Sequence, residues 1–101
     1  MLREKVIMIS GVGPGLGREM AIGAIREGAK VSIACRTQVY LDELSLELQK
    51  LGGEVCAVKT DISNEDETQN FVDKTLSQFG RIDALINNAI AGYDLIPFEK
   101  S

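Results

Sequence analysis

Four short, largely apolar runs alternate with three longer amphipathic segments along this chain. The runs occupy residues 5–10, 30–35, 55–58 and 82–87. A short apolar run without polar interruption is typical of a strand that is buried on both faces of a sheet. Strands alternate with helices where right-handed crossovers join parallel strands. The pattern therefore predicts an α/β chain of order βαβαβαβ that forms a doubly wound parallel sheet.

The segments between these runs have the period and the end signals of helices. Residues 16–27 repeat apolar side chains at helical spacing, and Gly28 follows as a left-handed stop. The second segment places four leucines on one face before two glycines: Leu41, Leu44, Leu48 and Leu51. Ser63 is expected to cap the third helix and Gly80 to close it. The apolar residues predicted to form its buried face are Phe71, Val72, Leu76 and Phe79.

Composition and charge exclude several classes of function. The chain has no His, which removes the Ser-His-Asp triad and any His-ligated zinc site. Net charge is −4: residues 1–50 contain 7 basic and 6 acidic residues, and residues 51–101 contain 4 basic and 9 acidic residues. The sequence therefore lacks the basic stripe that is expected of a nucleic-acid-binding protein. No apolar run approaches the roughly 18 residues of a membrane span. We expect a soluble, cytoplasmic chain without nucleic-acid or membrane partners, in which Cys35 and Cys56 are buried, reduced thiols.

A glycine-rich loop lies between the first predicted strand and the first predicted helix. It reads Ser-Gly-Val-Gly-Pro-Gly-Leu-Gly-Arg over residues 10–18. A loop with few Cβ atoms brings backbone amides close to a phosphate, and the amino end of the following helix adds free N–H donors. The pattern G-x-G-x-x-G fails in both frames, because Leu16 and Arg18 stand where its last glycine is needed. A nucleotide-triphosphate loop fails as well, since no Gly-Lys-Ser/Thr follows.

Two known glycine patterns remain, and they belong to different enzyme classes. Gly11-x-x-x-Gly15-x-Gly17 resembles the motif of short-chain dehydrogenases/reductases, whereas Gly11-x-Gly13-x-Gly15 resembles the first motif of S-adenosylmethionine-dependent methyltransferases. The methyltransferase pattern needs an acidic residue before its first glycine and another at the end of the second strand. Ile9 and Cys35 stand there instead. The first resemblance is therefore favoured. It implies a Rossmann-type fold with a dinucleotide diphosphate on the loop residues Gly11, Gly13, Pro14, Gly15, Leu16 and Gly17.

The end of the second predicted strand indicates which dinucleotide is bound. Arg36 lies 19 residues beyond Gly17, close to the roughly 20 at which this fold reads the adenosine ribose. A carboxylate there would accept hydrogen bonds from the ribose hydroxyls of NAD. Arg36 instead offers a cationic fork that suits a 2′-phosphate, with the Thr37 hydroxyl beside it. We expect NADP(H) to be preferred over NAD(H); the alternative is an arginine that is merely solvated.

Two further resemblances to the short-chain family follow the third and fourth predicted strands. Asp61-Ile62 is similar to the family's Asp-Val pair, which meets the adenine ring, although Asp61 also suits a turn before the Ser63 cap. Residues 87–89 resemble the start of the family's Asn-Asn-Ala-Gly motif, which implies that Asn87 braces the sheet and that Asn88 and Ala89 border the cofactor ribose. Ile90 replaces the family's glycine.

The family's reaction is reversible hydride transfer between a nicotinamide cofactor and an alcohol or carbonyl substrate. It uses a Tyr, a Lys four residues later and a Ser. Neither Tyr40 nor Tyr93 has Lys at that spacing, because Leu44 and Pro97 stand there. We therefore assign no catalytic residue and no metal ligand, and expect residues 1–101 to be the N-terminal half of a longer dinucleotide-binding domain, inactive alone.

Such a partial domain carries structural expectations. The sheet should have the strand order 3-2-1-4 and be truncated after its fourth strand, which leaves that strand at an edge. The isolated chain should be marginally stable and prone to associate, and the full-length parent is compatible with a homo-oligomer. A non-catalytic module that senses the dinucleotide pool is the main alternative function, and a methyltransferase is the third.

Overall fold

The computed structural model describes residues 4–11, 16–61 and 63–87, and residues 1–3, 12–15, 62 and 88–101 lie outside that description. Its seven elements alternate as predicted: β1 (Val6–Ser10), α1 (Leu16–Arg26), β2 (Lys30–Cys35), α2 (Gln38–Lys50), β3 (Val55–Lys59), α3 (Glu65–Phe79) and β4 (Ala84–Asn87). The strands form one parallel sheet in the order β3-β2-β1-β4. The expected architecture and strand order are confirmed.

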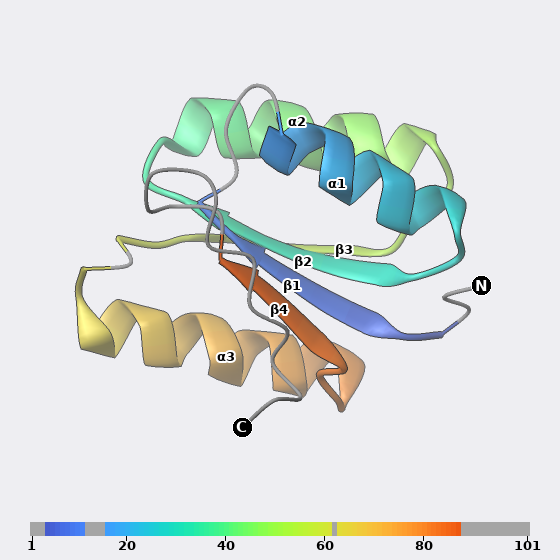
Figure 1. Ribbon diagram of the computed structural model, residues 1–101. Coiled ribbons are helices and arrows are strands. Elements are labelled where there is room, and N and C mark those ends of the chain that lie inside the picture. Colours follow the sequence, from blue (N-terminus) through green and yellow to red (C-terminus); the bar gives the residue numbers. More distant parts are fainter. Residues whose placement is uncertain (1–3, 12–15, 62, 88–101) are drawn as a thin grey trace.

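Helices cover the two faces of the sheet unequally. Figure 1 shows α1 and α2 on one face and α3 on the other. Side chains alternate between two cores: Ile7 and Ile9 of β1 pack beneath α1 and α2, whereas Met8 packs toward α3. Strand β2 does the same, with Ile33 on the first face and Ala34 on the second. Because both faces of the central strands are covered, polar residues do not alternate regularly with apolar ones, which explains the largely apolar sequence of these strands.

The ends of the helices follow backbone chemistry. Gly28 and Gly80 have φ values of 95° and 80°, the left-handed conformation that glycine adopts without steric cost and that commonly ends a helix. At the start of α3 the predicted Ser63 cap is wrong by one residue. Asn64 is the cap, and its side-chain oxygen accepts a hydrogen bond of 3.1 Å from the Glu67 amide. Ser63 is engaged elsewhere, because its amide and hydroxyl both donate to Asp61.

Two leucines that share a predicted apolar helix face with buried residues are exposed. Leu51 follows the end of α2 as its C-cap and is 43% exposed. Leu76 on α3 is 42% exposed, and the neighbouring Thr75 is buried in its place. The reason is a polar partner on the sheet, since the Thr75 hydroxyl meets the Ser32 hydroxyl of β2. Thr75 therefore faces inward together with Phe71, Val72 and Phe79, which pack on this side of the sheet.

The fourth strand is shorter than predicted. It begins at Ala84, two residues after the predicted start. Asp83 joins it to β1 in another way: the Asp83 amide donates to the Val6 carbonyl, and the Asp83 carboxylate accepts from the Val6 amide at 2.7 Å. Both cysteines are free and buried, as expected. Within the described ranges, none of the helices is long and apolar enough to cross a membrane.

Candidate functional site

All the strands of the sheet end at the same edge, where the predicted site residues follow them. Ser10 of β1 lies opposite Ala34 of β2 on one side and Asn87 of β4 on the other. The connection that leaves β1 leads to α1 on one face of the sheet, whereas the connection that leads into β4 comes from α3 on the other face. In open α/β sheets, ligands bind in the crevice at this edge. The fold brings the described candidate residues Gly11, Arg36, Thr37 and Asp61 to that edge, together with the Asn87 backbone.

The connection from β1 to α1 begins with a backbone conformation suited to glycine. Gly11 has φ 71°, which side chains with a Cβ rarely adopt. Helix α1 begins at Leu16, and Gly17 is buried in its first turn. The first amides of a helix lack partners within it and point outward from its amino end. Gly13, Pro14 and Gly15 lie outside the described residues.

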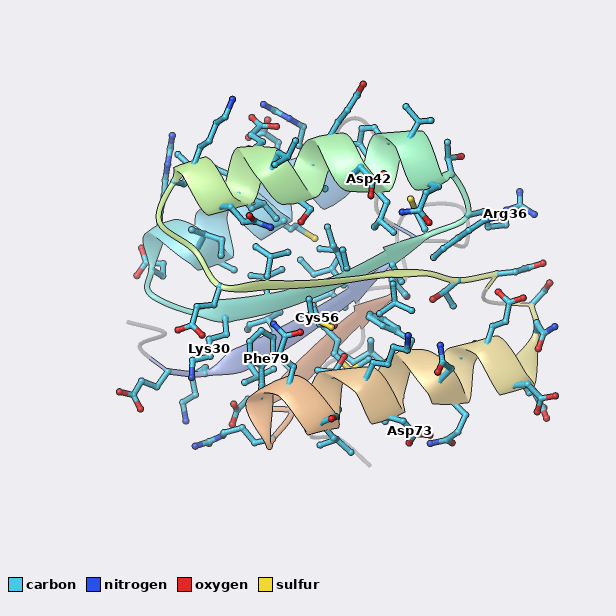
Figure 2. The ribbon with its side chains drawn as sticks, turned by 180° about the vertical axis from the view of Figure 1, so that it is seen from behind. Lys30, Arg36, Asp42, Cys56, Asp73 and Phe79 are labelled. Carbon is cyan, nitrogen blue, oxygen red and sulfur yellow. The ribbon has the colours of Figure 1, made fainter. Side chains whose placement is uncertain are left out.

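Arg36 lies directly after β2 and is exposed. Figure 2 shows its side chain extending outward from the end of the strand. Among the residues that the structure describes, ion pairs hold Arg18 and Arg81, but Arg36 is in none of them. Its guanidinium is thus a charged hydrogen-bond donor directed to solvent at the edge of the sheet.

Thr37 continues the turn into α2 as the N-cap residue of that helix. Its carbonyl accepts a hydrogen bond from the Leu41 amide at 3.0 Å and another from the Cys35 thiol at 3.3 Å. The Thr37 side chain forms no cap hydrogen bond. The backbone of the residue after Arg36 is therefore fixed, while its exposed hydroxyl is not used to cap the helix.

Asp61 is anchored in the turn that leads to α3. Its Oδ1 accepts from the Ser63 hydroxyl at 2.6 Å and from the Ser63 amide at 3.0 Å, and its own amide donates to Glu67. The Ser63 hydroxyl, then the Ser63 amide and the charge of Arg36 hold the pKa of Asp61 below its usual range. The turn-forming role that the sequence left open is confirmed. Ile62 lies outside the described residues.

The last candidate motif is described only at its first residue. The backbone of Asn87 lies in β4 beside Ser10. Asn88, Ala89 and Ile90 lie outside the described residues, so the position that departs from the family motif is not placed.

An ion pair that the sequence analysis missed joins the start of α1 to α2. The Arg18 Nε donates to Glu47 Oε1 at 3.1 Å, and Arg18 Nη2 contacts Glu47 Oε2. The hydrogen bond to Glu47 raises the pKa of Arg18. The hydroxyl of Tyr40 is buried and has no partner among the described residues, and burial raises its pKa. A signal was available: a cation in the first turn of a helix opposes the helix dipole, so Arg18 needed an acidic partner.

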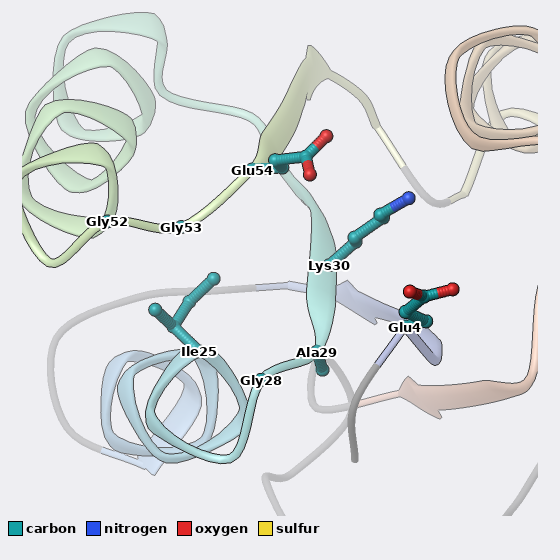
Figure 3. Close-up of a pocket in the computed structure, with 8 residues that line it drawn as sticks. All are labelled: Glu4, Ile25, Gly28, Ala29, Lys30, Gly52, Gly53 and Glu54. Atoms are coloured by element: carbon teal, nitrogen blue, oxygen red, sulfur yellow. The ribbon is translucent and has the colours of Figure 1, made fainter.

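A pocket of about 270 Å³ lies at the opposite edge of the sheet, where β2 and β3 begin (Figure 3). Lys30, Glu4 and Glu54 bring charges to it, and glycines form much of the rest of its lining. Gly53 packs closely against Ile25 there, and a Cβ at this position would overlap the Ile25 side chain unless that side chain moved. The pocket is separate from the candidate site. Within the described ranges, no three His, Cys, Asp or Glu residues are grouped so as to hold a metal ion.

Comparison with known proteins adds independent information. The sequence model of the family described as short chain dehydrogenase matches residues 5–100. The oxidoreductase YxnA of Bacillus subtilis (strain 168) is 38% identical over 88 residues, which cover 87% of this chain and 25% of YxnA.

Solved structures are similar in the same way. A short chain dehydrogenase from Bacillus anthracis has 40% identity and a TM-score of 0.81, over 88% of this chain and 36% of the other. A hydroxysteroid dehydrogenase from Escherichia coli has 34% identity and a TM-score of 0.83, over 86% of this chain and 37% of the other. The chain spans between 25% and 36% of the length of the curated relatives that it matches.

Proposed function

This chain belongs to the short-chain dehydrogenase family, and on that premise we propose that it binds a nicotinamide dinucleotide along the carboxyl edge of its sheet and prefers NADP(H). The observation that carries the preference is the place of Arg36, exposed at the end of β2 and in no described ion pair. An arginine at that position offers two N–H donors to a phosphate in one plane.

The amino end of α1 is the proposed seat of the diphosphate. Gly11 turns the chain out of β1 in a left-handed conformation, and the outward amides of α1 offer hydrogen bonds and a favourable dipole. The residues assigned to this seat are the loop set Gly11, Gly13, Pro14, Gly15, Leu16 and Gly17. A dinucleotide suits the geometry because its diphosphate lies between its two nucleosides, as β1 lies between β2 and β4.

The adenosine half is proposed to lie across the ends of β2 and β3. Arg36 and Thr37 would hold the 2′-phosphate, and Asp61 and Ile62 would border the adenine ring. In the opposite direction, Asn87, Asn88 and Ala89 would border the second ribose. The Asp61 carboxylate suits this role as a hydrogen-bond acceptor, because both hydrogen bonds from Ser63 go to its Oδ1.

The whole protein is proposed to be an oxidoreductase acting on an alcohol or carbonyl group. When bound, the nicotinamide supplies the hydride chemistry. None of the 101 residues is a Tyr followed four positions later by Lys. We therefore propose that residues 1–101 form the cofactor-binding half of a longer domain. By themselves, these residues would bind the dinucleotide without turning substrate over.

Isothermal titration with NADPH and NADH tests the proposal. Wild type should bind NADPH more tightly, and Arg36→Ala should lose about 1.5 to 3 kcal/mol of NADPH binding, which is about 10- to 150-fold, because a charged hydrogen bond is removed. NADH affinity should change little. Arg26→Ala is a matched control, since Arg26 is also exposed but ends α1 at the opposite edge. Equal affinities in wild type, or an unchanged NADPH affinity in Arg36→Ala, would contradict the preference.

A non-catalytic dinucleotide sensor is the second candidate, favoured by the missing Tyr-x-x-x-Lys pair. The coding sequence beyond Ser101 separates the two: that pair downstream indicates an enzyme, and a stop codon after Ser101 indicates a sensor. The methyltransferase alternative is not supported, because the family match is to dehydrogenases.

A further inference from the structure

The ends of β2 and β3 place two opposite charges side by side at the edge of the sheet. Cys35 lies opposite Lys59 in the parallel register, and the Thr60 amide donates to the Cys35 carbonyl at 2.9 Å. Arg36 follows Cys35 directly, and Asp61 follows Thr60. Neighbouring strands lie about 4.8 Å apart, so the two backbones are within a few ångströms of each other.

The two charges differ in how firmly they are held. Two hydrogen bonds from Ser63 fix the Asp61 carboxylate in its turn. Arg36 is exposed, and none of the described ion pairs includes it. Arg36 is nevertheless close enough for its charge to favour the ionised form of Asp61, after the larger effect of Ser63, so the pKa of that carboxyl is lowered. A fixed negative charge therefore lies beside a positive side chain that is free to turn toward a ligand.

We infer that Asp61 is a specificity-determining residue that weakens the binding of 2′-phosphorylated dinucleotides relative to their unphosphorylated forms. The inference rests on the proposed function. A phosphomonoester held by Arg36 carries a charge of about −1.5 to −2 at neutral pH, whereas the 2′-hydroxyl of NAD(H) carries none. Both dinucleotides share the diphosphate, so the additional repulsion between the fixed carboxylate and a 2′-phosphate acts on NADP(H) alone. Arg36 and Asp61 together set the preference, with opposite signs.

The expected size follows from Coulomb's law. A unit charge about 7 Å from a phosphate of charge near −2 raises its dissociation constant about three- to tenfold in dilute salt. At 0.15 M ionic strength the Debye length is about 8 Å, so the effect should fall to about twofold. A contact between Asp61 and the adenine ring would behave differently, because both dinucleotides carry the same adenine.

The test is the ratio of the NADH and NADPH dissociation constants, measured by isothermal titration on wild type and on Asp61→Asn at two salt concentrations. Asn keeps the side-chain oxygen that accepts from Ser63 and removes only the charge. The ratio should rise about three- to tenfold in dilute salt and less at higher salt. Asp66→Asn is the control: it removes an exposed carboxylate from the first turn of α3 and should leave the ratio within about twofold of the wild-type value.

The outcomes separate the inference from the proposed function. If Arg36→Ala weakens NADPH binding but Asp61→Asn leaves the ratio unchanged, the role of Asp61 is overturned and the proposed preference stands. An equal loss of both cofactors in Asp61→Asn also overturns it, because the residue would then act only on the shared adenine. If wild type binds neither dinucleotide, both proposals fail. Circular dichroism spectra that match wild type establish that each variant is folded.

Discussion

A buried pair of hydroxyl groups joins the sheet to α3. Removing either hydroxyl should destabilise the fold, and the two losses should differ in size. Ser32 Oγ and Thr75 Oγ1 are 2.5 Å apart, and both residues are 0% exposed. Thr75 Oγ1 also lies 2.8 Å from the Phe71 carbonyl, to which it donates. Because the Thr75 hydroxyl has one proton and donates it to Phe71, Ser32 must be the donor to Thr75.

This assignment makes the two single variants unequal. Thr75→Val keeps the shape of the side chain but leaves the buried Ser32 hydroxyl without its acceptor, which costs about 1 to 3 kcal/mol. Ser32→Ala leaves the bond from Thr75 to Phe71 intact and should cost about 0.5 to 1.5 kcal/mol. In the double variant no buried Ser32 donor remains, so its loss should be smaller than the sum of the two by at least about 0.5 kcal/mol.

Urea unfolding followed by far-UV circular dichroism measures these free energies, provided that the slope with urea is unchanged among variants. Each kcal/mol should also lower the melting temperature by about 4 to 8 °C for a chain of this size. Additivity of the two losses within about 0.3 kcal/mol, or a Ser32→Ala loss larger than that of Thr75→Val, would refute the assigned direction of the hydrogen bond.

Four other substitutions bear on the free energy of unfolding. Asn64→Ala removes the cap of α3 and should cost about 0.5 to 2 kcal/mol, whereas Ser63→Ala at the originally predicted cap should cost less; urea unfolding compares them. Gly23→Ala should stabilise α1 by about 0.5 to 1 kcal/mol, because a Cβ there meets nothing within 4 Å; a lower melting temperature would contradict this. The Arg81 hydrogen bond and the Val6 amide lower the pKa of Asp83 in the folded state. The contribution of Asp83 to the free energy of unfolding is therefore complete above its unfolded-state pKa of about 3.9 and is lost as pH falls through its folded-state pKa. Asp83→Asn should make the urea midpoint depend less on pH over that range.

The sequence predicted the elements and their order because each signal depends on neighbouring residues or on a simple period. Continuous apolar runs give strands that are covered on both faces, and glycines such as Gly28 and Gly80 end helices by backbone conformation alone. These rules need no knowledge of the tertiary partner. The parallel sheet then follows from the short connections and the handedness of the crossovers.

The errors arose where a hydrogen-bond partner decided the outcome rather than residue type. Leu76 has the right apolar character for the buried face of α3, but Thr75 is buried there instead, where its hydroxyl meets that of Ser32, 43 residues away. Ser63 and Asn64 are equally good caps by residue type, and the Asp61 carboxylate decides between them by engaging Ser63. Such choices depend on specific hydrogen-bond partners and cannot be read from residue propensity alone.

For the candidate site, the sequence predicted which strand ends carry the polar residues, and the parallel topology brings them to one edge. It did not predict that Ser63 fixes Asp61 while Arg36 stays outside the described ion pairs. It also missed the bond from Arg18 to Glu47, because that bond joins two helices. The assignments of Gly13, Pro14, Gly15, Ile62, Asn88 and Ala89 remain predictions.

The position of β1 between β2 and β4 has a consequence for biosynthesis. One side of β1 pairs with β2, which is synthesised soon after it. The other side pairs with Asp83, which is 77 residues beyond Val6, and with β4, which follows Asp83. At about 5 to 20 residues per second, a ribosome needs about 4 to 15 seconds to add that stretch. During this interval the backbone N–H and C=O groups on one side of β1 have no strand to pair with. We therefore expect chaperones that shield unpaired backbone to matter most before β4 emerges from the ribosome.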